Sequence, residues 1–153
     1  MRKLFLTFFY SGLSPKAPGT IGTIAGVVVA FFILSYFPSS TLGTLLLFIT
    51  IVGVLEINRY EKETSSHDSK EIVIDEVAGI WMAILLCINT PDFFKYIVTF
   101  IYFRIFDIWK PSIIGRIDEN VKGGLGVMGD DLIAGIVAGI CSAGTYQIYM
   151  SIF

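Results

Sequence analysis

The stretch RIFDIWKPSIIGRIDENVKGGLGVMGDD, residues 104–131, decides how this chain is organised. It carries nine charged residues and lies between two strongly apolar runs. It begins inside an apolar helix pattern, where Arg104, Asp107 and Lys110 follow at three-residue steps. This spacing keeps the three side chains on roughly one side of a helix. Pro111 is then expected to end or kink that helix.

The second half of this stretch is rich in glycine and ends on two acids. Gly123 and Gly124 open it, and Asp130 and Asp131 precede the uncharged run 132–153. We expect a loop here that closes on the two carboxylates at the start of the last helix. Charge placed where apolar helices meet a polar loop is costly unless it has a function.

The composition of the whole chain favours a membrane protein with several spans. Hydrophobic residues make up 54% of the 153 positions, charged residues make up 16%, and mean hydropathy is +0.74. Soluble domains are nearer about 45–50% apolar and about 25% charged. The length corresponds to a single domain, 1–153. A net charge of −2 without a long basic run gives no indication of nucleic acid as a partner, and no pattern indicates an oligomeric state.

Apolar runs extend outward from the central stretch in both directions and predict an all-α membrane protein of about five helices. The first run is close to the roughly 20 residues that a bilayer span needs. Its Gly22 and Gly26 lie four residues apart, which suits close packing against another helix. The five runs are 20–37, 41–57, 72–88, 93–109 and 132–153.

The distribution of charge predicts the orientation of these spans. The turns at 38–41 and 89–92 are expected on one side of the membrane, and the charged segments on the other. Ten of the eleven Lys and Arg residues belong to that second side, with Lys95 as the exception. Because cytoplasmic loops carry an excess of Lys and Arg, we expect the charged side to face the cytoplasm.

Acidic residues from three separate segments map to this charged side. Carboxylates that converge in a poorly solvated place must share protons, pair with bases or bind a cation. Mg²⁺ prefers oxygen ligands and is typically held by one or two carboxylates together with substrate phosphate oxygens. The predicted Mg²⁺ ligands are Asp75, Glu76, Asp107, Asp130 and Asp131.

Basic residues lie in the same segments as these acids. Lys70, Arg104, Lys110 and Arg116 suit a phosphate ester, because arginine can bind phosphate through two parallel hydrogen bonds. A phosphate ester held beside a divalent cation is therefore the favoured ligand.

Simpler explanations exist for each of these groups. Residues 130–131 are equally well explained as carboxylates that stabilise a helix N-terminus through its dipole. Residues 75–76 could pair with Arg104 or Lys110 across helices. Residues 123–124 could form an ordinary turn rather than a backbone cradle for phosphate.

Three segments taken together resemble the phosphatidylglycerophosphatase A family. They are SGLSPKAPGTIGT (11–23), DSKEIVIDEVAGIW (68–81), and FRIFDIWKP with GGLGVMGDDLIAG (within 103–135). They cover a little under half of the chain, in the order and spacing of the family. The family usually has prolines where Ser69 and Ile113 stand, and these positions shape the backbone rather than bind a ligand.

The resemblance implies an all-helical, Mg²⁺-dependent phosphatase of the bacterial inner membrane. It implies hydrolysis of phosphatidylglycerophosphate, a lipid of the bilayer, to phosphatidylglycerol and phosphate. On this basis we expect catalytic roles for Asp75, Glu76, Asp107 and Asp131. A metal-activated water and a direct aspartate nucleophile, with Asp75 and Asp131 as candidates, both remain open.

The residues expected to bind the lipid phosphate come from all three segments, with Ser14 completing the headgroup pocket. They are Lys16, Thr20, Asp68, Lys70, Arg104, Lys110, Gly123 and Gly124. A small transporter or ion-channel subunit is the alternative function, because acids that face bases inside a membrane also mark ion pathways. A pathway requires polar positions across the full membrane depth, whereas the far halves of these spans are apolar.

Overall fold

The computed structural model describes residues 1–64, 69–110 and 121–152, and this part of the chain is helical, without strands. The prediction of an all-α fold is therefore confirmed. The elements are α1 (Arg2–Leu6), the 3₁₀ turn η1 (Ser11–Leu13), α2 (Pro18–Tyr36), α3 (Ser39–Thr64), α4 (Ile74–Leu86), the π-helical segment η2 (Phe93–Val98), α5 (Thr99–Trp109) and α7 (Gly124–Ile152).

Three of these helices, α2, α3 and α7, are long and apolar enough to cross a membrane. The chain is accordingly a membrane protein. Helix α4 has 13 residues, which corresponds to about 20 Å, and η2 with α5 forms one further stretch over 93–109. The five apolar runs thus correspond to helical stretches, of which three reach the length of a full span.

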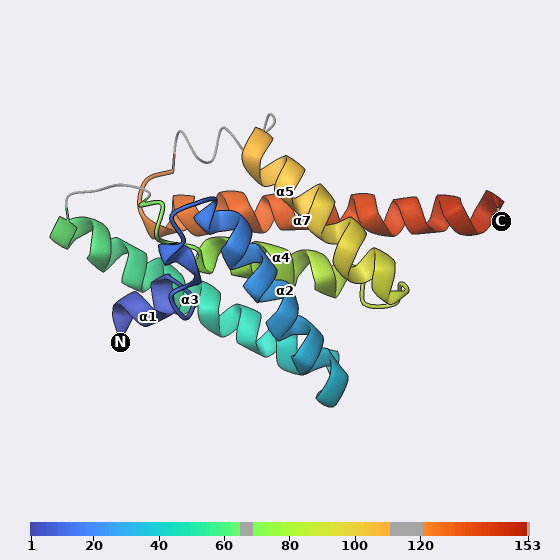
Figure 1. Cartoon of the computed structure of the whole chain (residues 1–153), viewed down its shortest axis with the longest axis horizontal. Coiled ribbons are helices and arrows are strands. Elements are labelled where there is room, and N and C mark those ends of the chain that lie inside the picture. Colours follow the sequence, from blue (N-terminus) through green and yellow to red (C-terminus); the bar gives the residue numbers. More distant parts are fainter. Residues whose placement is uncertain (65–68, 111–120, 153) are drawn as a thin grey trace.

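Helix α4 is the centre of the fold, and α2, α3, α5 and α7 all pack against it (Figure 1). Its side chains are buried on nearly every face, including Val77, Ile80 and Ile84. Trp81 donates a hydrogen bond from Nε1 to the backbone oxygen of Gly26, at 2.8 Å, and so ties α4 to α2. The buried Gly26 confirms that the glycine face of α2 packs against a neighbouring helix.

The helix ends fall into two groups, as the predicted topology requires. Helices α2, α4 and α7 begin, and α3 and α5 end, at the same end of the molecule as α1 (Figure 1). The turns that join α2 to α3 and α4 to η2 lie at the opposite end, as does the C-terminus. The charged segments of the described chain are thereby gathered at one end.

One prediction about local structure is wrong. Helix α7 begins at Gly124, so Asp130 and Asp131 lie in its second turn rather than at its N-terminus. Helix capping therefore does not explain these two carboxylates. The helix extends this far back because Gly124 packs directly on the backbone of Val54 in α3, and its N–H donates to Asn58 Oδ1 at 2.9 Å.

Candidate active site

A cleft of about 530 Å³ opens at the charged end of the molecule, among α2, α4, α5 and α7. Helix α5 ends at Trp109, as the position of Pro111 predicted, and Lys110 follows it in the left-handed region with φ 41°. The charged residues that line the cleft come from the segment before α4 and from α4, α5 and α7. They are Lys70, Asp75, Glu76, Arg104, Asp107, Lys110, Asp130 and Asp131.

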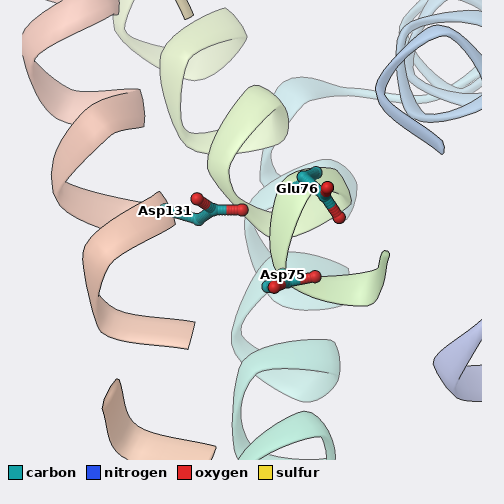
Figure 2. Close-up of side chains that lie close together, drawn as sticks. All are labelled: Asp75, Glu76 and Asp131. Atoms are coloured by element: carbon teal, nitrogen blue, oxygen red, sulfur yellow. The ribbon is translucent and has the colours of Figure 1, made fainter. Parts of the chain in front are cut away.

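Three carboxylates meet on one side of this cleft. Asp75 and Glu76 occupy the first turn of α4, and Asp131 reaches toward them from α7 (Figure 2). Each residue offers one oxygen, and the three oxygens lie within 4.8 Å of one another. Asp75 and Asp131 are buried. We call these three residues the acid cluster.

Glu76 occupies a confined position in the acid cluster. Its Oε2 atom is buried and has no hydrogen-bond partner among the described residues. Its Oε1 atom lies so close to the start of α2 that a Cβ atom on Gly19 would overlap it. A buried carboxylate oxygen without a partner costs free energy, which a bound cation would offset.

Arg104 on α5 lines the cleft and is held by two partners. Its Nη1 atom forms an ion pair with Asp107 Oδ2, one helical turn away, and donates to Thr23 Oγ1 at 3.3 Å. Its Nε atom is buried and has no partner among the described residues. The guanidinium is therefore oriented on one side and has donor capacity left on another.

A second ion pair closes the end of the cleft. Lys110 Nζ lies 2.6 Å from Asp130 Oδ2, which joins the end of α5 to α7. Asp130 is 2% exposed, so this pair is only weakly screened by solvent. Ion pairing with Arg104 or Lys110 was considered from the sequence for residues 75–76, whereas the structure shows Arg104 paired with Asp107 and Lys110 paired with Asp130.

The formal charges of the described residues that line the cleft do not balance. Its described lining holds five acids and three bases, an excess of two negative charges. A single divalent cation would match this excess, and the acid cluster supplies the oxygen ligands that Mg²⁺ or a similar hard cation prefers. The residues present therefore fit a divalent metal ion.

The cleft contains nine of the predicted site residues. They are the eight charged lining residues given above and Thr20. Lys16 is exposed and does not line it, and Ser14 donates its hydroxyl hydrogen to the backbone oxygen of Lys16 at 2.9 Å. Gly123 and Gly124 are not among the lining residues and pack against α3 instead. Asp68 and Arg116 lie outside the described residues.

Two residues of the site were missed at the level of the sequence. Gly19 lies against Glu76 and near Arg104, and Thr23 hydrogen-bonds Arg104. Both belong to the segment 11–23 that carries the family resemblance, so that segment pointed to them. Their side chains carry no charge, and only the approach of α2 to α4 and α5 reveals their position.

Comparison with known proteins places the chain in a family. The family model described as Phosphatidylglycerophosphatase A matches residues 4–146. Phosphatidylglycerophosphatase A of Escherichia coli (strain K12) is 37% identical over 130 residues, which cover 85% of this chain and 74% of that protein. Phosphatidylglycerophosphatase A of Haemophilus influenzae is 36% identical over 135 residues, covering 85% of this chain and 79% of that protein.

A third relative carries a different name. A protein of Bacteroides thetaiotaomicron, provisionally named a phosphatidylinositol-3-phosphatase, is 34% identical over 142 residues. The match covers 90% of this chain and 88% of that protein. No solved structure gives a significant match. Each named activity of these relatives is the removal of phosphate from a phospholipid headgroup.

Proposed function

This chain belongs to the phosphatidylglycerophosphatase A family, and we propose that it hydrolyses phosphatidylglycerophosphate to phosphatidylglycerol and phosphate. It is a phosphoric monoester hydrolase of phospholipid metabolism that acts in a membrane. The observation that carries this proposal is the cleft itself. The acid cluster faces Arg104 and Lys110 at one end of a bundle of membrane helices.

We assign the metal of this reaction as Mg²⁺, held by Asp75, Glu76 and Asp131. When bound, the ion would neutralise negative charge on the phosphoryl oxygens and polarise the phosphorus–oxygen bonds. Two observations support this assignment: Glu76 Oε2 has no hydrogen-bond partner among the described residues, and the described lining of the cleft has a formal excess of negative charge. The three ligands come from α4 and α7, which pack extensively against each other, so the protein holds them in place.

The bases of the cleft bind the phosphate of the substrate. Arg104 donates from the guanidinium face that its partners leave unused, and Lys110 contributes its charge from the end of α5. Lys70 approaches from the segment before α4, and Thr20 lies in the first turn of α2, where the helix dipole favours an anion. These groups also stabilise charge on the equatorial oxygens in the transition state.

Asp107 and Asp130 act on the bases rather than on the metal. Asp107 pairs with Arg104, and Asp130 pairs with Lys110. Each carboxylate fixes the direction of its partner before the substrate arrives, which lowers the entropy lost on binding. We therefore propose that both are positioning residues.

The reaction is balanced by water. One water molecule supplies the hydroxyl group that phosphorus gains, and its remaining proton ends on the glycerol oxygen after the phosphorus–oxygen ester bond breaks. The products are phosphate and a lipid alcohol. Arg104 and Lys110 hold the phosphoryl group during this exchange.

We place the protein in the bacterial inner membrane with the cleft facing the cytoplasm. The segments that the sequence assigns to the charged side carry ten of the eleven Lys and Arg residues of the chain, and such an excess is typical of cytoplasmic segments. This orientation presents the cleft to lipids of the cytoplasmic leaflet.

Phosphate release by the purified full-length protein in detergent micelles tests the substrate. Equal concentrations of phosphatidylglycerophosphate, phosphatidylinositol 3-phosphate and phosphatidic acid are compared, with an Asp75→Ala variant as the blank. We expect the highest kcat/KM for phosphatidylglycerophosphate. A preference for phosphatidylinositol 3-phosphate would support phosphatase activity but contradict the proposed substrate. No phosphate release from any of the three lipids by folded protein would overturn the proposal.

A further inference from the structure

A shallow apolar groove, open to the surroundings along its length, continues from the cleft along the outer face of α5. It has a volume of about 470 Å³ and is lined by one face of that helix. Two of its lining residues, Arg104 and Ile108, also line the cleft, so the two hollows adjoin. Its lining residues are Phe100, Ile101, Arg104, Ile105, Ile108 and Trp109.

We infer that this groove holds an acyl chain of the lipid substrate while its phosphate lies in the cleft. The inference rests on the proposed function and specifies how that substrate is oriented. A phospholipid joins an apolar chain to a phosphate within one molecule, so its binding site must place an apolar surface next to a phosphate-binding surface. Arg104 stands at this junction, with its charge directed to the cleft and apolar neighbours on either side along α5.

The groove is distinguished from the rest of the lipid-facing surface by this continuity. A second apolar hollow, of about 440 Å³, lies among α1, α2, α3 and α4 and shares no lining residue with the cleft. Of these two apolar hollows, the groove on α5 is the one that adjoins the cleft, and a lipid whose phosphate is bound at Arg104 has its glycerol beside it. Entry of the substrate is therefore lateral, from the bilayer along α5.

The first test separates the contribution of the acyl chains to binding from that of the headgroup by comparing two substrates. Phosphatidylglycerophosphate with dioleoyl chains is compared with the dihexanoyl form, whose short chains cannot fill the groove. Ile101→Trp obstructs the groove, and Ile51→Trp on α3 is the matched control, because the two isoleucines are 51% and 57% exposed.

For Ile101→Trp we expect KM for the dioleoyl substrate to rise roughly threefold to tenfold, with kcat/KM for the dihexanoyl substrate unchanged. The Ile51→Trp control should match wild type on both. Equal effects of the two variants, or an equal effect of Ile101→Trp on both substrates, would overturn the inference. Wild-type turnover of the dihexanoyl substrate reports the proposed function separately, because that measurement does not depend on the groove.

A second test needs no variant. A phosphonate analogue of the substrate, which resists hydrolysis, carries a photoactivatable diazirine on one acyl chain and is irradiated with the full-length protein in micelles. We expect labelling concentrated on residues 100–109 and removed by excess unlabelled phosphonate. Labelling spread evenly over the lipid-facing helices, or unaffected by the competitor, would show an ordinary lipid shell and contradict the groove.

Discussion

Lys110 Nζ and Asp130 Oδ2 lie 2.6 Å apart and form an ion pair between the end of α5 and the second turn of α7. The pair closes the cleft and joins the beginning of the central stretch, residues 104–131, to its end. A second lysine–aspartate pair, Lys95 with Asp92 at 3.1 Å, lies at the start of η2, beside the turn that follows α4. The two pairs have the same chemistry and differ in their place relative to the cleft, which makes one the control for the other.

Replacing Lys110 with Met should lower kcat/KM by about tenfold to a hundredfold. The change removes a phosphate-binding charge and leaves Asp130 buried beside the phosphate, where the two negative charges repel. Steady-state phosphate release measures the loss. Lys95→Met should leave kcat/KM within about twofold of wild type, because Lys95 does not line the cleft and its partner Asp92 is 74% exposed. A similar loss in both variants would indicate that lysine charge acts through folding rather than in the cleft.

Replacing Asp131 with Asn should lower kcat by about a thousandfold or more while the protein stays folded. The substitution removes one of the three ligands of the acid cluster and keeps the volume of the side chain. In the presence of EDTA, the Asp131→Asn variant should melt at or above the wild-type temperature, because buried like charges destabilise one another. Near-normal turnover by the variant would remove Asp131 from the catalytic site.

Thr23 is expected to affect substrate binding indirectly, through its hydrogen bond with Arg104. Thr23 is fully buried, donates to the Gly19 backbone oxygen at 2.7 Å and accepts from Arg104 Nη1 at 3.3 Å. Thr23→Val removes the acceptor at nearly constant volume, and we expect KM to rise by about fivefold to tenfold with a smaller change in kcat. Thr23→Ser keeps the hydroxyl and should restore the wild-type KM, which a purely structural role of the methyl group would not permit.

A side chain at Gly19 should move Glu76, because a Cβ atom there would overlap Glu76 Oε1. Gly19→Ala is expected to displace Glu76 from the acid cluster and to lower kcat by about tenfold or more. Gly43→Ala on α3 is the control, since a Cβ atom at Gly43 meets nothing within 4 Å. That variant should retain full activity and gain slight stability from the better helix propensity of alanine. Full activity in Gly19→Ala would contradict the confined position of Glu76.

Much of the fold could be predicted from the sequence, because apolar runs separated by charged or proline-containing segments have few alternatives in a membrane. Helix α5 ends before Pro111 as expected. The beginning of α7 could not be predicted in this way. Glycines lower helix propensity, and the helix extends through 124–131 because Gly124 packs on Val54 and donates a hydrogen bond to Asn58.

The candidate site was predictable in its residue types and less so in their partners. The sequence placed five carboxylates on one side of the membrane, and the cleft contains all five. It could not separate Asp75, Glu76 and Asp131 from Asp107 and Asp130, because that division depends on which carboxylate a base from another turn or helix reaches. In the folded protein Arg104 reaches Asp107 and Lys110 reaches Asp130.

The acid cluster is predicted to hold a divalent cation that the phosphatase reaction requires. The most direct test measures phosphate release from phosphatidylglycerophosphate in micelles after treatment with EDTA, followed by addition of Mg²⁺ in excess. We predict that EDTA abolishes release, that Mg²⁺ restores it, and that Asp131→Asn stays inactive at every Mg²⁺ concentration. Release that continues unchanged in EDTA would contradict the claim.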